Sequence, residues 1–176
     1  MNRGEDAWLE YKSTFRVDST TGDKFAPVET AALKTVAAFL NSWDGGTLLL
    51  GVAEDEAGNG IPFGLGLDYV SVHKDGKDDA DMFQLMLTDV MKASMGAAAI
   101  SNVTTQMHTV DGNDICRVHI KPCGFPVDAK VTEIKKGQHV KAVNFYTRIN
   151  NGTHKFIDDN EWEKFKNYRW PGVTGG

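Results

Sequence analysis

The chain is poor in cysteine and has no long apolar stretch. Its 176 residues include two cysteines, Cys116 and Cys123, which are too few for a disulfide scaffold and belong to no metal-ligand cluster. No apolar run approaches the ~20 residues of a membrane span, and no charged segment followed by an apolar one marks a signal peptide. These absences argue against a disulfide-rich secreted domain and a membrane protein, and they predict a cytoplasmic protein with reduced thiols.

Several common catalytic signatures are also missing. Gly45-Gly46 lacks both the P-loop lysine and the G-x-G-x-x-G spacing, so it predicts a tight turn and not a phosphate cradle. The serines lack a nucleophile-elbow context. The five histidines show no paired metal spacing and are interpreted as surface or structural residues: His73, His108, His119, His139 and His154.

Charge is distributed unevenly along the chain. The formal net charge of −5 argues against nucleic acid as a partner, because phosphate binding favours a basic surface. However, residues 1–120 carry 9 Lys and Arg against 18 Asp and Glu, whereas residues 121–170 carry 10 against 6. An acidic centre beside a basic flank suits a metal site that also holds a polyanion. The alternative interpretation is an unevenly charged, solubilising surface.

The first half of the chain predicts a strand, a helix and a second strand. Residues 8–15 alternate as a strand, with Leu9, Tyr11 and Phe15 on one face and Glu10 and Lys12 on the other. Residues 29–41 have the apolar spacing of an amphipathic helix. Residues 47–53 form an almost continuous apolar run, which is typical of a strand covered on both faces.

Acidic residues gather at the ends of these two strands. Glu5 precedes the first strand on an incoming turn or short helix, Glu10 lies in it, and Glu54 and Asp55 follow the second strand. A fold that gathers carboxylates usually holds a divalent cation there, because the charges otherwise repel one another and lose water at a cost. The alternative is that these acids only make a loop hydrophilic.

The second half predicts further hairpins and helices. Residues 58–69 and 133–140 are interpreted as loops, and 71–81 as a polar, mobile stretch in which Asp79 or Asp81 caps the next helix. Residues 102–110 and 115–121 flank a hairpin turn, residues 144–149 form a strand, and Asp158 and Asp159 begin a terminal helix. The result is an α+β fold with a mixed, mostly antiparallel sheet of five or six strands, layered by three helices. We expect one domain over residues 1–170 and a flexible tail over 171–176.

Four segments together resemble the Schlafen AlbA-like domain, found in Schlafen proteins and in many bacterial proteins described as DNA-binding. They are Glu5 with Glu10-Tyr11-Lys12, Ala37-Ala38-Phe39-Leu40-Asn41, Gly45-Gly46-Thr47-Leu48-Leu49-Leu50-Gly51-Val52 and Asn144-Phe145-Tyr146-Thr147-Arg148. The resemblance spans residues 5–157 and implies an AlbA-like fold.

The resemblance also implies a reaction. Nuclease-active Schlafen members use three acids to hold Mg²⁺ or Mn²⁺ and cleave RNA, and these fall on Glu5, Glu10 and Glu54, with Asp55 as the alternative third acid. Lys12 matches the lysine of the glutamate motif and is expected to contact phosphate in catalysis. From their charge alone, Arg16 and Arg148 are expected to hold flanking phosphates. The alternative for all three cations is that they are solvated surface charges or partners in weak ion pairs.

Three hypotheses follow. The first is a metal-dependent endoribonuclease acting on structured, tRNA-like RNA, with RNA favoured over DNA and a role in stress or antiviral defence. The second is a non-catalytic DNA- or RNA-binding module of a larger regulatory or defence protein, using Lys135, Lys136, Lys141 and Arg148. The third is an assembly domain, as a homodimer or attached to another domain. None of them involves a membrane.

Overall fold

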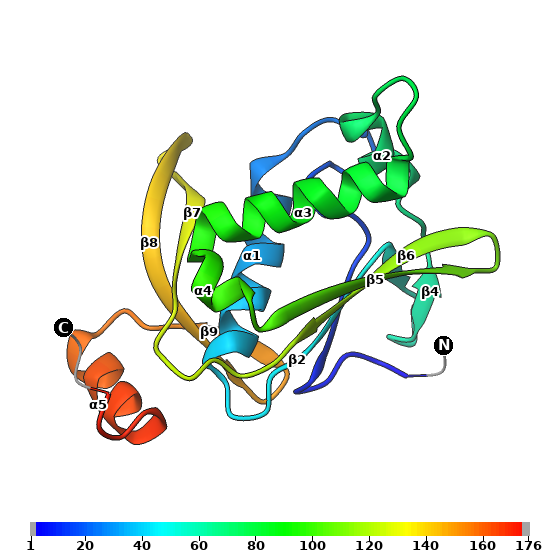
Figure 1. Cartoon of the computed structure of the whole chain (residues 1–176). Helices are drawn as coiled ribbons and strands as arrows, with labels where there is room; N and C mark the ends of the chain where they lie inside the picture. Colours follow the sequence, from blue (N-terminus) through cyan, green and yellow to red (C-terminus); the bar gives the residue numbers. More distant parts are fainter. Residues whose placement is uncertain (1–2, 174–176) are drawn as a thin grey trace.

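The computed structural model describes residues 3–173 and has a four-stranded sheet at its centre (Figure 1). The strand order is β1 (Leu9–Lys12), β2 (Gly46–Leu50), β6 (Asn113–Ile120) and β5 (Val103–Val110). β1 and β2 run parallel, as the connection through a helix requires, while β2, β6 and β5 pair antiparallel. The two strands that carry the acids in the sequence are therefore neighbours, as predicted.

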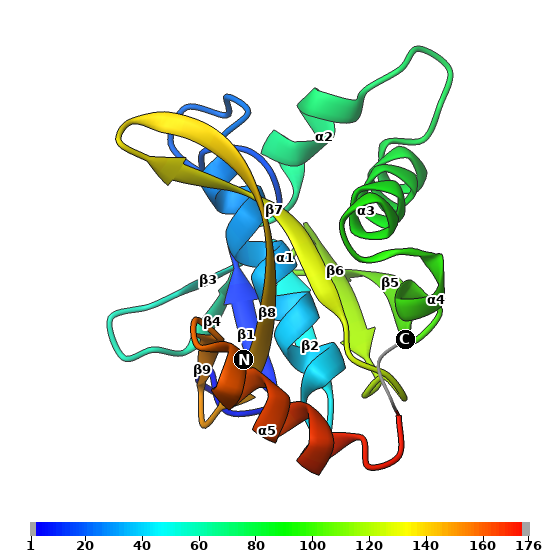
Figure 2. The ribbon, with the colours of Figure 1, turned by 90° about the vertical axis from the view of Figure 1, so that its left-hand side faces the viewer.

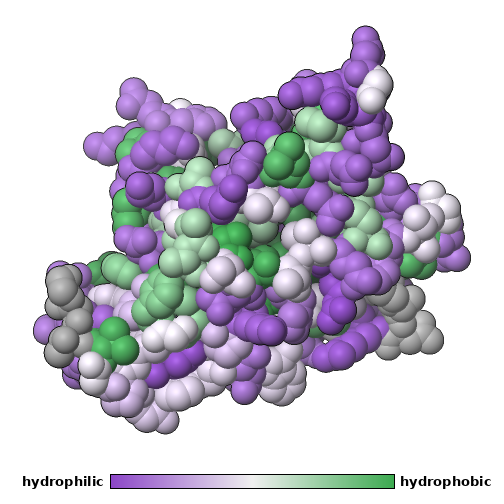
Figure 3. Space-filling view, in the orientation of Figure 1, coloured by the Kyte–Doolittle hydropathy of each residue, from purple (hydrophilic) through white to green (hydrophobic). Residues whose placement is uncertain are grey.

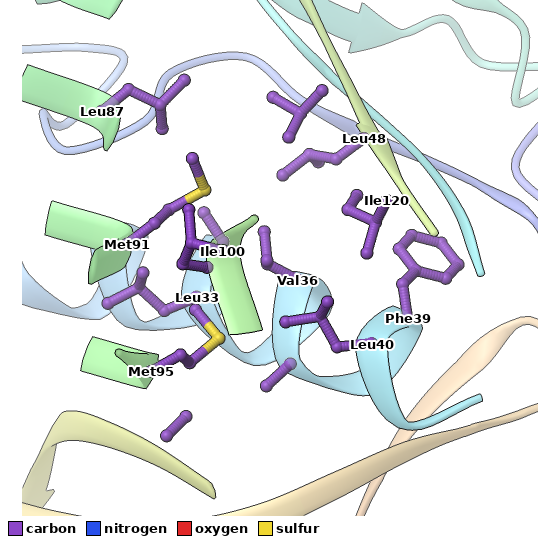
Figure 4. Close-up of a cluster of buried hydrophobic side chains, with 14 of the residues drawn as sticks. Leu33, Val36, Phe39, Leu40, Leu48, Leu87, Met91, Met95, Ile100 and Ile120 are labelled. Atoms are coloured by element: carbon purple, nitrogen blue, oxygen red, sulfur yellow. The ribbon is translucent and has the colours of Figure 1, made fainter. Parts of the chain in front are cut away.

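The main core lies where two long helices meet this sheet. α1 (Ala26–Asn41) contributes Leu33, Val36, Phe39 and Leu40, spaced so that they share a buried face. α3 (Asp79–Met95) adds Leu87, Met91 and Met95, and β2 and β6 add Leu48 and Ile120 (Figure 4). Burial of this apolar surface is the main force that holds helices and sheet together.

A second sheet curls around the opposite side of α1. It consists of β7 (Asp128–Lys135), β8 (Gln138–Ile149) and β9 (Gly152–Lys155), and Figure 2 shows it in front of α1. α5 (Asp159–Arg169) follows β9. The remaining elements are the two-stranded ribbon of β3 (Val52–Glu54) and β4 (Gly60–Pro62), and the short helices α2 (Gly66–Val72) and α4 (Ala97–Ile100).

The predicted α+β class and the mostly antiparallel pairing are confirmed. The three predicted helices correspond to α1, α3 and α5. The predicted hairpin is β5–β6, and its turn places Asp111 at φ 51° and Gly112 at φ 76°. Both values are those of the primed turns that suit a twisted hairpin.

The number of elements was underestimated, because residues 3–173 form nine strands and five helices. The predicted loop at 58–69 contains β4 and α2. The predicted loop at 133–140 is the tip of the β7–β8 hairpin, which turns at Lys136 (φ 50°) and Gly137 (φ 76°). This hairpin tip projects from the body of the molecule, so residues 134–140 are exposed on both faces and the sequence lacks an alternating pattern (Figure 2). Hydrophilic residues cover this upper edge of the molecule in Figure 3.

Three finer expectations also need correction. The cap of α3 is Asp78, whose Oδ1 accepts the Asp81 N–H at 2.9 Å. β1 ends at Lys12, so Phe15 leaves the strand and packs in the main core, while Tyr11 packs in a smaller cluster with Val52 and Ile115. The predicted strand at 47–53 is broken at Gly51.

Gly51 divides that strand because of its backbone conformation. It has φ 86°, and a Cβ there would lie 2.9 Å from the Asp114 carbonyl oxygen. Its carbonyl accepts the N–H groups of Phe63 and Gly64 at 2.8 and 2.9 Å. The chain thereby leaves the central sheet and starts the β3–β4 ribbon, whose first strand, β3, ends at Glu54.

No helix in the described part of the chain is long and apolar enough to cross a membrane.

Asn41 joins the end of α1 to the second sheet. It is fully buried, and its Nδ2 donates to the carbonyl oxygens of Val127 and Tyr146, both at 2.8 Å. Its Oδ1 accepts the Val127 N–H at 2.9 Å. One amide therefore satisfies three buried backbone groups from two segments that are distant in the sequence.

We expect Asn41→Ala to lower the free energy of unfolding by about 3 kcal/mol, because each buried backbone group left without a partner costs about 1–3 kcal/mol and such costs are not additive. Urea unfolding measures the change. Asn167→Ala, at an exposed position of α5, is the matched control and should change it by less than about 0.5 kcal/mol. Equal effects of the two substitutions would contradict the role of Asn41.

Candidate functional site

Glu10 lies between two cations. Its Oε1 is 2.7 Å from Lys12 Nζ, two residues along β1, and its Oε2 is 3.1 Å from Nη1 of Arg148 in β8. The side chain of Arg148 is 4% exposed and that of Glu10 is 13% exposed. β1 places Glu10 and Lys12 on the same side because strand side chains alternate, so the prediction that these two share a face is confirmed.

Arg148 connects four parts of the chain. Besides Glu10, its Nη1 contacts Thr153 Oγ1 at 3.3 Å, and its Nη2 donates to the carbonyl oxygens of Asp6 and Asn151, both at 3.0 Å. The guanidinium also lies 4.8 Å from the ring centroid of Phe39 in α1. A planar fork of five donors suits such a site, and most of its donors are committed to the protein.

Glu5 lies beside this ion-pair cluster. Its Oε1 accepts the Tyr11 N–H at 2.7 Å, which orients the carboxylate over β1. Burial raises the pKa of Glu5, and the nearby charges of Glu10 and Glu54 raise it further, whereas the Tyr11 hydrogen bond and Lys12 act in the opposite direction. Glu5, Glu10 and Glu54 therefore share one electrostatic neighbourhood, although they come from a loop, β1 and β3.

Asp55, the alternative third acid, has a different task. Its Oδ1 accepts the N–H groups of Ala57 and Asn59 at 2.9 and 2.7 Å, and its Oδ2 accepts Asn59 Nδ2 at 3.1 Å. These hydrogen bonds lower the pKa of Asp55 and close the turn between β3 and β4. The geometry therefore favours Glu54, at the exposed end of β3, over Asp55.

The donor chemistry of the three acids fits Mg²⁺ or Mn²⁺, because both prefer carboxylate oxygens. In residues 3–173 there is no group of three or more His, Cys, Asp or Glu side chains that could hold a metal ion by themselves. Mg²⁺, however, is usually held by one or two carboxylates together with substrate phosphates and water. The acids are therefore suited to a cation that arrives with a phosphate.

The other predicted basic residues lie away from this cluster. Arg16 Nε is 3.4 Å from Glu29 Oε2, and the Arg16 N–H donates to the buried Asp68 at 3.1 Å. Lys135, Lys136 and Lys141 lie on the β7–β8 hairpin, where Lys141 donates to Thr132 and Lys135 pairs with Glu133 at 3.5 Å. At about 3.3 Å per residue, the hairpin tip is roughly 40 Å along β8 from Arg148.

Comparisons with known proteins agree with the fold. The family model described as "Schlafen, AlbA_2" matches residues 5–157. No curated protein matches the chain. A solved structure of the DIP2311 protein from Corynebacterium diphtheriae is similar, with a TM-score of 0.51 and 14% sequence identity over 92% of this chain. This chain spans 27% of that protein's structure, and at such low identity the likeness shows the fold alone.

The raised pKa of Glu5 has a measurable consequence for stability. At pH values between the unfolded and the folded pKa of Glu5, the native state binds more protons than the unfolded state does. The free energy of unfolding therefore falls as pH rises through this range, and above it the full cost of holding an ionised Glu5 is present. Glu5→Gln keeps an oxygen for the Tyr11 N–H and removes the charge. We therefore expect it to raise the free energy of unfolding at pH 7, and to lose this advantage well below pH 4.

Urea unfolding at both pH values tests this expectation. Glu56→Gln, at an exposed position in the adjacent turn, is the control and should change stability at pH 7 by less than about 0.5 kcal/mol. A Glu5→Gln protein that is less stable than the parent at pH 7 would contradict the conclusion that burial and neighbouring negative charges disfavour the ionised form of Glu5.

Proposed function

Because this chain belongs to the Schlafen AlbA_2 family, whose members have nucleic-acid-related functions, we propose that it is a divalent-metal-dependent endoribonuclease acting on structured, tRNA-like RNA. The observation that best supports this is the ion-pair cluster of Glu10, Lys12 and Arg148, beside which Glu5 accepts the Tyr11 N–H and is influenced by the charges of Glu10 and Glu54. Carboxylates can bind a metal cation and the basic side chains can bind a phosphate, so a cluster of both suits a reaction that needs the two together.

Each residue has a separate role in this proposal. Glu5 and Glu54 would supply carboxylates to hold Mg²⁺ or Mn²⁺, and the chemistry that such an ion would supply there is activation of water and stabilisation of charge on phosphoryl oxygens. Lys12, with 25% of its side chain exposed, would exchange its ion pair with Glu10 for one with a phosphate oxygen. Glu10 Oε1 would then be free to serve as the third carboxylate oxygen. Arg148 keeps Glu10 oriented through Oε2. Arg148 is too well covered and bonded to serve mainly as a surface phosphate contact.

The test is cleavage of a labelled, folded tRNA by the purified protein with Mn²⁺ or Mg²⁺. We expect Glu5→Gln and Glu54→Gln each to slow cleavage by about 100-fold or more, because each removes a charge that acts on the transition state. Both substitutions keep the Glu10–Arg148 ion pair and are therefore preferable to changes at Glu10.

Glu56→Gln is the matched control for this assay and should cleave at the parent rate, since Glu56 is exposed in the turn and outside the cluster. Cleavage that persists unchanged in Glu5→Gln and Glu54→Gln, or that needs no divalent cation, would overturn the proposed mechanism.

A second candidate function is binding without cleavage, and the lysines of the β7–β8 hairpin favour it. Lys135 is 62% exposed, Lys136 lies at the turn, and Lys141 is exposed on β8. Each lysine that neutralises a phosphate adds about −0.7 to the slope of log K against log salt for a single strand. The hairpin would then hold an RNA or DNA segment well separated from the acids.

We expect simultaneous Lys→Gln substitution of Lys135, Lys136 and Lys141 to reduce that slope by about 2 units, at three phosphate contacts. Fluorescence anisotropy with labelled RNA and DNA over a range of salt concentrations measures it. The control carries the same charge change at Lys74, Lys77 and Lys92, on and before α3. Equal slopes for both triple variants would remove the hairpin from the binding surface.

A further inference from the structure

A pocket of about 300 Å³ adjoins the acidic cluster through Arg148. Its lining residues come from the segment that leads into β1, the α1–β2 loop and the end of β8. These segments meet at the lower end of the molecule, near α5, in Figures 1 and 2. Its walls include Trp8, Trp43, Asp44 and Arg148. Because Arg148 also holds Glu10, a ligand in this pocket would lie next to the residues to which we assign catalysis.

The two tryptophans of this pocket are unusually exposed. Trp8 is 53% exposed and Trp43 is 51% exposed, whereas Trp162 and Trp170 are buried at 7% and 4%. The last two close the apolar layer around α5, which is the common task of aromatic residues at the ends of elements. Trp8 and Trp43 do not share that task, so about half of each residue's surface is available to a ligand.

Both rings are nevertheless held in place. Trp8 Nε1 is 3.4 Å from Asp44 Oδ2, and the Trp8 N–H donates to Asp6 Oδ1 at 2.8 Å. Trp43 meets Tyr168 edge-on, at a centroid distance of 5.2 Å, and the Arg169 guanidinium lies 4.9 Å from its centroid. A ring whose position is already fixed loses less entropy when it stacks on a ligand.

The charge in the pocket indicates which part of a polynucleotide enters it. The Asp44 carboxylate repels a phosphate, and it accepts N–H groups of the kind that bases carry on their Watson–Crick edges. The positive charge of Arg148 is mostly used by Glu10 and three backbone or hydroxyl oxygens. The pocket is therefore better suited to a base than to the backbone.

We propose that this pocket binds one unpaired nucleobase of the RNA, stacked on Trp43 and Trp8, while the adjoining phosphate lies at Glu5, Glu10 and Glu54. The inference rests on the proposed function and adds a substrate requirement to it, namely an unstacked nucleotide beside the scissile bond. Loops, bulges and single-stranded ends of a folded RNA present such bases, whereas a blunt duplex does not.

The experiment measures binding separately from cleavage. Fluorescence anisotropy in EDTA compares a labelled eight-nucleotide RNA strand with the same strand in a blunt duplex. We expect Trp43→Ala to weaken single-strand binding by about tenfold, as the loss of one base–aromatic stack does. Trp43→Phe, which retains an aromatic face, should restore most of it, and duplex binding should change little.

Phe25→Ala is the matched control, because Phe25 is 42% exposed at the opposite end of α1. Circular dichroism confirms that each variant is folded. The inference is overturned if Trp43→Ala and Phe25→Ala bind the single strand equally well, or if the parent prefers the duplex. If Trp43→Ala loses single-strand binding and the parent does not cleave RNA with any metal, the base-binding pocket is supported and the proposed nuclease activity is refuted. If Trp43→Ala binds and cleaves like the parent in the presence of metal, the nuclease activity is supported and the base-binding pocket is refuted.

Discussion

The ion pair between Glu10 and Arg148 is the constraint on which the site depends. A guanidinium with 4% of its side chain exposed must find partners within the protein, and removal of one partner from such a pair costs more than the pair contributes. Here the partners come from β1, from the segment before it, and from the β8–β9 turn and β9. The hydrogen bonds of Arg148 therefore hold the second sheet against the edge of the first, beside Glu5 and Glu10.

The inner half of β8 is fastened in two places, and the outer half pairs with β7. Asn41 binds the Tyr146 carbonyl from the end of α1, and Arg148, two residues further along, reaches β1. Beyond these contacts the β7–β8 hairpin extends past α1 and carries the exposed lysines. One end of β8 is therefore held by several tertiary hydrogen bonds, and the other end presents exposed lysines to solvent.

Much of this arrangement could be predicted from periodicity. The apolar spacing in residues 29–41 and the run at 47–53 predicted a strand, a helix and a neighbouring strand, and so brought the Glu10 and Glu54 regions together. The partner of Arg148 could not be predicted from periodicity, because 138 residues separate it from Glu10 and the contact forms only once β8 has packed beside α1. The exposure of Trp8 could not be predicted from the sequence either, since it depends on how the α1–β2 loop lies beside β1.

The break at Gly51 separates the position of Glu54 from the architecture of the central sheet. The β3–β4 ribbon is anchored at its base by hydrogen bonds to the Gly51 carbonyl, and the turn at its tip is closed by Asp55. Insertions or deletions at that tip would change the ribbon's length without shifting the register of β1, β2 and β6. Because Glu54 precedes the tip, such changes would leave its carboxylate near Glu5 while the central sheet stays unaltered.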